Sequence, residues 1–83
     1  MNEKIWNLSD IEVGEHCLVQ GLTAKGAMRR RLLDIGLVEG ASVVCIGKSP
    51  GGDPRAYRIC GAVIAIRARD ARDVCVERGV RWV

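Results

Sequence analysis

The cysteines and the one histidine of this 83-residue chain are the side chains that could ligate a transition metal or act as nucleophiles. Cys17, Cys45, Cys60 and Cys75 are separated by 28, 15 and 15 positions, and no two of them form the C-x-x-C pair usual in zinc modules. His16 directly precedes Cys17, and neighbours on a strand point to opposite faces, so these two side chains are poorly placed to share an ion. We therefore predict free thiols and no metal or cofactor site, with Cys17 and Cys45 pointing inward and Cys60 and Cys75 outward.

Catalysis and nucleic-acid binding have little support in the sequence. His16 has no identifiable serine or cysteine partner, and the carboxylates fall in turns without a paired arrangement. Nucleic-acid binding usually needs basic residues together with exposed aromatic side chains for stacking. The chain has no Phe and only Trp6, Tyr57 and Trp82, and its formal charge is a modest +3. We expect a binding module that is not an enzyme and has no nucleic-acid partner.

The densest charged feature is the run Arg29, Arg30 and Arg31, preceded by Lys25. Planar guanidinium groups offer several hydrogen-bond donors to an acidic surface, so we predict that these four residues contact a partner protein. A solvated helix face without a partner is the plain alternative. A second alternative is an anion site at residues 23–26, where backbone N–H groups and a lysine precede a helix, although the spacing of a nucleotide-binding loop is missing.

A short amphipathic helix must carry this basic run. Met28, Leu32 and Ile35 recur at i, i+4 and i+7, which predicts a helix over residues 27–35 with one apolar stripe toward the rest of the fold. Gly36 supplies the left-handed residue that ends the helix.

The helical period also divides the arginines. At about 100° per residue, Arg30 and Arg31 point away from the apolar stripe, whereas Arg29 falls within or beside it. We expect the aliphatic stem of Arg29 to lie along the barrel with its guanidinium at the edge.

The remaining pattern is that of short strands separated by turn signals. An N-terminal turn, a Pro- and Gly-rich hairpin tip, a reversal at Gly61 and a polar turn at residues 69–73 divide the chain. The five predicted strands lie at residues 16–22, 42–47, 55–60, 63–67 and 74–77, followed by a tail at 78–83. Five strands with one short helix after the first strand predict a mainly β, small, partly open barrel. We expect one domain over residues 1–83 with its core at about 8–77.

Neither a membrane span nor a signal peptide is visible. No apolar run approaches the roughly 20 residues that a span needs, and residues 1–6 lack a basic cluster followed by an apolar stretch. We therefore expect a cytoplasmic protein without direct membrane insertion, in a reducing compartment that disfavours disulfides. Exposed strand edges leave a homo-oligomer open.

The order of these signals resembles the FeoA family, small cytosolic proteins of the bacterial ferrous iron uptake system with an SH3-like fold. The resemblance covers about residues 8–77. A looser version of the pattern occurs in the C-terminal domain of iron-dependent repressors, and a free-standing chain favours the transport component. The matching positions are residues 8–10, Gly14, residues 29–37, Gly40, Pro50, residues 52–54, residues 64–67 and Ala71.

The resemblance implies a role as a non-enzymatic accessory of the FeoB iron permease, a membrane protein with a cytosolic GTP-binding domain. The protein would contact that cytosolic part and modulate iron transport or nucleotide turnover. The alternative is an SH3-like regulatory or nucleic-acid-binding module related to the domain of iron-dependent repressors. No metal role carries over to the four cysteines.

Overall fold

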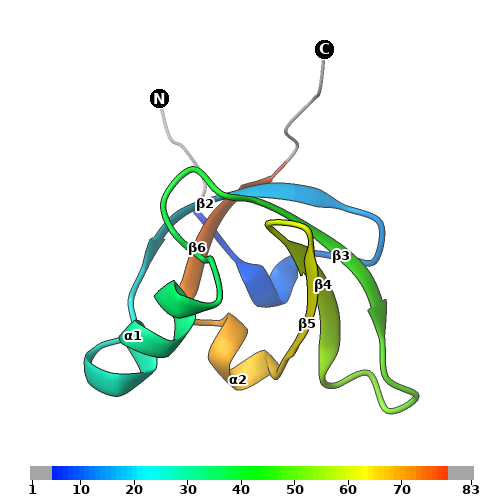
Figure 1. The fold of residues 1–83 in the computed structure, drawn as a ribbon. Helices are drawn as coiled ribbons and strands as arrows, with labels where there is room; N and C mark the ends of the chain where they lie inside the picture. The colour runs from blue at the N-terminus through cyan, green and yellow to red at the C-terminus, as the bar shows by residue number, and fades with distance from the viewer. Residues whose placement is uncertain (1–4, 79–83) are drawn as a thin grey trace.

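Six antiparallel strands of the described chain form one curved sheet, in the spatial order β1-β6-β2-β3-β4-β5 (Figure 1). The computed structural model describes residues 5–78. The prediction of a mainly β, partly open barrel is confirmed. The strands are β1 (Trp6–Asn7), β2 (His16–Leu22), β3 (Ser42–Lys48), β4 (Arg55–Ile59), β5 (Ala62–Ile66) and β6 (Val74–Arg78), and the helices are the 3₁₀ turn η1 (Leu8–Asp10), α1 (Gly26–Asp34) and α2 (Ala68–Ala71).

Three details of the predicted element set are wrong. The described strands number six instead of five, because β1 pairs with β6 (Trp6 opposite Val76), and a two-residue strand is too short to show alternation. The turn expected at residues 69–73 begins as the one-turn helix α2. Arg78, expected in the tail, is the last residue of β6, while the rest of that tail, including Trp82, lies outside the described residues.

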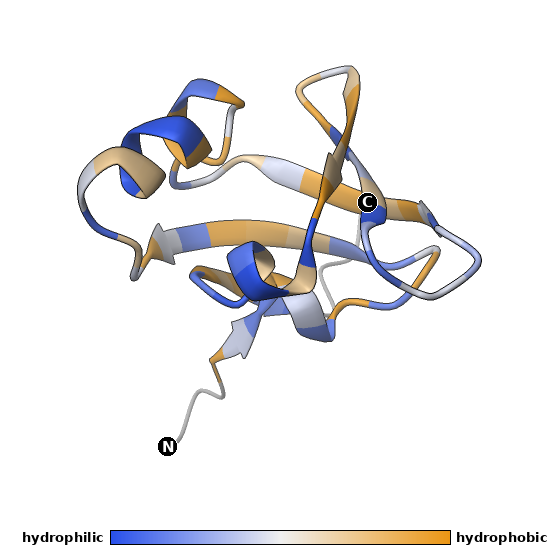
Figure 2. Ribbon diagram, turned by 90° about the horizontal axis from the view of Figure 1, so that it is seen from below, coloured by the Kyte–Doolittle hydropathy of each residue, from blue (hydrophilic) through white to orange (hydrophobic). Residues whose placement is uncertain are grey.

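The side chains that the sheet encloses are mainly aliphatic. Figure 2 shows the long strands mostly in hydrophobic colours and the helices carrying hydrophilic residues. Tyr57 is buried among the aliphatic residues, where its hydroxyl donates a 3.4 Å hydrogen bond to the Leu8 carbonyl and burial raises its pKa to about 12. Shifts of register within β2 and β3 are bulges, which bend both strands around this core. The buried set is Leu8, Ile11, Cys17, Val19, Ala24, Leu32, Leu37, Val43, Cys45, Tyr57, Ile59, Ile66, Ala71, Val74 and Val76.

The hairpin of β4 and β5 closes through Cys60 and Gly61, which both have positive φ (51° and 84°). Two successive positive φ angles are typical of a type I′ turn, whose twist matches that of the flanking strands. The predicted tight reversal at Gly61 is confirmed, and it places β5 beside β4 with Ala62 opposite Ile59.

An ion pair ties the last strand to the loop before β2. Arg78 donates from Nε and Nη2 to the Glu15 carboxylate over 2.8–3.0 Å, and its guanidinium lies 4.4 Å from the centroid of the Trp6 ring. The main-chain N–H of Glu12 also donates to Glu15, and this bond together with Arg78 holds the pKa of Glu15 below its usual value. These contacts fasten β1, β6 and the loop to one another.

One side chain connects the hairpin tip between β3 and β4 to α2. Asp53 Oδ1 accepts a 2.8 Å hydrogen bond from the N–H of Ala68, the first residue of α2. The preceding residue, Arg67, provides no side-chain cap, so the carboxylate of Asp53 satisfies a helix N–H that its own segment leaves open. Asp53 therefore has a structural role.

We expect the Asp53→Ala substitution to lower the free energy of unfolding by about 1 kcal/mol, because α2 loses its only side-chain cap from the described residues. Urea denaturation followed by circular dichroism measures this difference. Asp53→Asn keeps a side-chain oxygen that can accept the hydrogen bond and should restore most of the loss. Equal destabilisation by both substitutions would show that the cap is not the cause.

Candidate functional site

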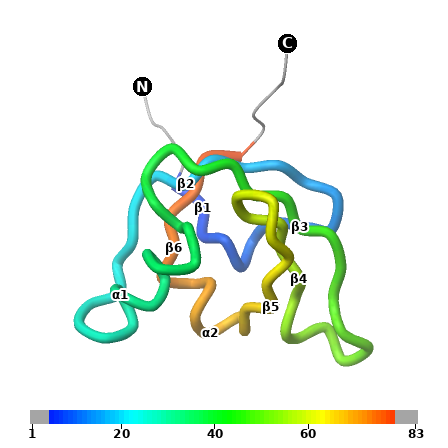
Figure 3. Tube along the Cα trace, viewed as in Figure 1, coloured from blue at the N-terminus to red at the C-terminus, as the bar shows by residue number. Residues whose placement is uncertain are grey.

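Helix α1 lies in the connection from β2 to β3 (Figure 3). It carries the three arginines of the basic run. Lys25, an exposed residue, precedes it with extended backbone and no side-chain cap. At the other end, Gly36 N–H donates to the Leu33 carbonyl and Leu37 N–H to the Leu32 carbonyl, over 3.0 and 3.1 Å. With Gly36 at a φ of 105°, this is a Schellman cap, so the predicted end of the helix is confirmed. No helix within residues 5–78 has the length and apolar character needed to cross a membrane.

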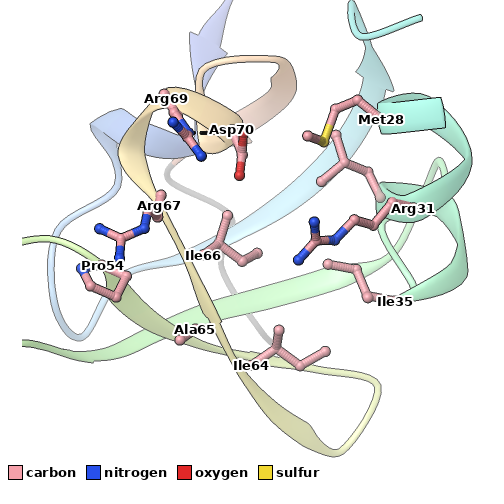
Figure 4. Close-up of a pocket in the computed structure, with 11 residues that line it drawn as sticks. Met28, Arg31, Ile35, Pro54, Ile64, Ala65, Ile66, Arg67, Arg69 and Asp70 are labelled. Carbon is pink, nitrogen blue, oxygen red and sulfur yellow. Dashed lines mark ion pairs between the residues drawn. The ribbon is translucent and has the colours of Figure 1, made fainter. Parts of the chain in front are cut away.

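A groove of about 340 Å³ lies between α1 on one side and β5 and α2 on the other (Figure 4). In this view Arg31 and Ile35 point from α1 toward Ile64 and Ile66 of β5. The isoleucines are buried or half-buried, whereas the arginines are exposed, so the floor is apolar and the rim is charged. The lining residues are Met28, Arg31, Leu32, Ile35, Pro54, Ile64, Ala65, Ile66, Arg67, Arg69 and Asp70.

The structure divides the arginine run differently from the prediction. Arg31, expected to point away from the apolar stripe, lines the groove beside Ile35, its i+4 neighbour. Arg29, expected with its stem along the barrel, is exposed and borders with Arg30 a depression of about 220 Å³ on the outer side of α1. The reason is that the helix packs shallowly, with only Leu32 fully buried. The half-buried part of the apolar stripe therefore faces the groove, on the same side of the helix as Arg31.

Two further arginines reach the groove from its opposite wall, and the sequence prediction omitted them. Arg67 follows β5 and Arg69 lies in α2, where it forms an exposed 3.8 Å ion pair with Asp70 that contributes little to stability. Within residues 5–78, neither Arg31 nor Arg67 makes an ion pair or a side-chain hydrogen bond. Across both walls, three arginines and one aspartate give the groove lining a formal charge of +2 (3 − 1). The only sequence signal is a second group of arginines, with Arg67 at the end of the predicted strand 63–67 and Arg69 two positions later.

The alternative anion site at residues 23–26 has an acidic neighbour. The Thr23 hydroxyl donates to the carbonyl and the carboxylate of Asp73, over 3.4 Å each, and the Thr23 N–H donates to the same carbonyl over 2.8 Å. An anion bound here would lie next to the Asp73 carboxylate. These contacts favour an ordinary strand-to-helix turn.

Cys17, Cys45 and Cys75 lie as the alternation of their strands predicts, whereas Cys60, expected as the last residue of a strand, lies in the turn after β4. Cys17 and Cys45 are buried inside the sheet, Cys75 is half-buried and Cys60 is exposed at the hairpin turn. Burial raises the pKa of the Cys17 thiol to about 12, so this group stays protonated at neutral pH. Among residues 5–78, no group of three or more His, Cys, Asp or Glu side chains is arranged to hold a metal ion.

These positions predict a graded reactivity of the cysteines. At pH 8, Ellman's reagent should modify Cys60 rapidly and Cys75 slowly, while Cys17 and Cys45 should react only after unfolding, because both of these thiols are buried and inaccessible, and burial also raises the pKa of Cys17. The time course of absorbance with and without denaturant measures this, and Cys60→Ser should remove the fast phase. Fast reaction of Cys17 in the folded protein would contradict the described core.

The chain matches the family described as FeoA domain over residues 6–78. It is 30% identical over 70 residues to the Fe(2+) transport protein A/Fe(2+) transporter FeoB fusion protein of Porphyromonas gingivalis, a match that covers 84% of this chain but only 8% of the fusion protein. A FeoA-like protein from Clostridium acetobutylicum is 30% identical, with a TM-score of 0.86 and coverage of 99% of this chain and 95% of that one. FeoA of Stenotrophomonas maltophilia, solved in complex with zinc and described as a prokaryotic SH3 domain protein, is 29% identical, with a TM-score of 0.78 and coverage of 87% and 89%. The predicted SH3-like fold is confirmed.

The same fold occurs in regulators of transcription. A manganese-dependent transcriptional repressor superimposes with a TM-score of 0.80 over 94% of this chain and 44% of its own. At 15% identity this likeness shows the shared fold alone.

Proposed function

Because the chain belongs to the FeoA family, we propose that it is a non-enzymatic accessory of bacterial ferrous iron uptake that binds the cytosolic part of a FeoB-type permease. The observation that carries the proposal is the fusion protein of Porphyromonas gingivalis, in which a relative of this chain is joined to the transporter. Two domains in one polypeptide are held at a high effective concentration, which favours contacts between them. Docking of the free chain in the cytoplasm would reproduce that association and modulate transport or GTP turnover.

The proposed docking surface consists of Arg29, Arg30 and Arg31 of α1, together with Lys25 directly before the helix. All four side chains are exposed, and none of them makes an ion pair within residues 5–78. Arginine side chains that are not engaged in the folded protein can pair with a partner's carboxylates without first breaking internal contacts. An acidic partner surface is the complement that this helix favours.

Binding of the purified chain to the isolated cytosolic part of the permease tests the proposal. We expect wild-type binding by biolayer interferometry, and a loss of at least tenfold in affinity after combined substitution of Arg29, Arg30 and Arg31 by Glu, because charge reversal replaces attraction by repulsion. Circular dichroism should show that the variant remains folded, since all three residues are exposed.

Two results would count against the proposal. Absence of binding by the wild-type chain, in vitro and in co-purification from native membranes, would remove the permease as the partner. Unchanged affinity of a folded triple variant would exclude the basic helix as the contact surface.

A further inference from the structure

Strand β5 is an edge of the sheet, because its only strand neighbour in the described chain is β4. Its sequence Ala62 to Ile66 contains neither a charge nor a proline, and these are the usual means by which edge strands avoid pairing with other chains. Val63 is 56% exposed. The edge is therefore able to accept another strand.

The register of the β4–β5 hairpin identifies which backbone groups lie on the open side. Ala62 and Ile59 flank a two-residue turn and form a hydrogen-bonded pair, after which bonded and non-bonded pairs alternate. It follows that Val63 and Ala65 direct their N–H and C=O groups away from β4. Within residues 5–78, no loop, turn or side chain bonds the main chain of either residue.

The groove lies along this open edge. Ile64 and Ile66 face inward, whereas Ala65 between them faces outward, yet all three line the groove. Consecutive residues of a strand point to opposite faces, so contact with all three residues indicates that the groove reaches the edge of the strand. Helix α1 forms the far wall, with Arg31 and Ile35 facing β5 (Figure 4).

The charges around the groove indicate which kind of strand would bind there. Arg31 and Arg67 stand on opposite sides of the groove without partners in the described chain, and Arg69 adds a third positive group near Asp70. An extended segment that alternates acidic and apolar residues would place its apolar side chains on Ile64 and Ile66 and its carboxylates at the arginines. A second copy of this chain is the less suitable occupant, because pairing β5 with β5 would bring two arginine-rich rims together.

We propose that the groove binds an extended, acidic segment of a partner protein, which adds as a strand to the free edge of β5 and pairs its carboxylates with Arg31 and Arg67. Main-chain hydrogen bonds to Val63 and Ala65 supply affinity, and the apolar floor with its charged rim supplies specificity. The inference deepens the proposed function and rests on it for the source of the segment, which would belong to the permease.

The test uses the peptide acetyl-Val-Glu-Val-Glu-Val-Glu-Val-amide as the probe and the full-length chain as the receptor. We expect binding by isothermal titration calorimetry, slower hydrogen exchange of the Val63 and Ala65 amides by NMR, and at least tenfold weaker binding of the peptide in which Lys replaces Glu. Two further peptides carry N-methyl groups on all Val amides or on all Glu amides. In an added strand the amides of alternate residues point to opposite sides, so either the Val amides or the Glu amides face β5. One methylated peptide should therefore bind like the parent, and the other at least tenfold more weakly.

A variant of the protein provides a second measurement. Ala65→Pro removes the N–H on the open edge without removing a bond to β4, so the sheet should tolerate it while peptide binding falls at least tenfold. If the variant does not fold, the methylated peptides still decide the mode of binding.

The outcomes separate the docking mode from the proposed function. Equal binding of both methylated peptides, unchanged exchange at Val63 and Ala65, or dimerisation of the free chain through β5 in sedimentation velocity would overturn the strand addition. Full permease binding by folded Ala65→Pro would also overturn it and leave the proposed function standing. Edge pairing of the peptide without any permease binding by the wild-type chain would keep the docking mode and reject the permease as its source.

Discussion

Substitution of Gly36 by alanine is expected to lower the free energy of unfolding by about 2–4 kcal/mol, which is a large fraction of the total for a domain of this size. Gly36 has a φ of 105°, which L side chains rarely adopt. A Cβ atom there would also lie 3.1 Å from Ile59 Cγ2 and 3.2 Å from Cys60 Sγ. Backbone strain and overpacking against β4 therefore act together.

Chemical denaturation of both proteins measures the effect of Gly36→Ala. Gly51→Ala is the matched control, because Gly51 has no positive φ and a Cβ atom added there would meet no heavy atom within 4 Å. This control substitution should change the free energy of unfolding by less than about 0.5 kcal/mol. If the two variants were equally stable, the Schellman cap would not determine the stability of the α1 terminus.

Charge reversal of Arg31 is expected to have the largest effect on binding. Arg31→Glu should weaken the affinity for the permease's cytosolic part at least tenfold, about 1.4 kcal/mol, because a carboxylate would replace the guanidinium inside the groove and repel an acidic segment. The reversal also leaves the groove wall with two arginines against two acids. Surface plasmon resonance at about 0.15 M salt measures the change.

Substitutions of other arginines distinguish a contact in the groove from general electrostatic attraction. Arg30 lies on the outer side of α1, so Arg30→Glu should weaken binding only a few-fold. The difference in affinity from the wild type should vanish at about 0.5 M salt, where exposed charges are screened. Arg58→Glu makes the same change of charge at an exposed position of β4 outside the groove and should behave as a control for net charge. An Arg31→Glu effect no larger than that of Arg58→Glu would contradict the groove as the docking site.

Features that depend on local chain geometry could be predicted from the sequence. The bounds of β2 follow from period-two alternation, and the end of α1 follows from Gly36, since both reflect residues a few positions apart. The inward position of Cys17 and Cys45 follows from the same alternation. These signals lie within one element, so one sequence is enough to read them.

Features that join distant segments could not be predicted in this way. Asp53 caps a helix 15 residues later, which no local motif indicates. The side of α1 that opens toward β5 depends on how deeply Leu32 is buried, and a helical wheel gives angles but no depth. For this reason Arg31 lines the groove and Arg29 is exposed, the reverse of what the helical period predicts. Arg67 and Arg69 join the groove from the opposite wall, and that juxtaposition has no local signal.

The position of β6 has a bearing on how the chain acquires its structure during synthesis. This strand, the last in the described sequence, lies between β1 and β2 in the sheet, and Arg78 stands opposite Cys17, 61 positions earlier (78 − 17). Loop closure over such separations is slow, and barrels dominated by non-local pairing fold in milliseconds to seconds. We therefore expect that on the ribosome β1 stays unpaired, and β2 lacks one of its two neighbours, until β6 has emerged. The core would then close only when nearly all of the described chain has been translated.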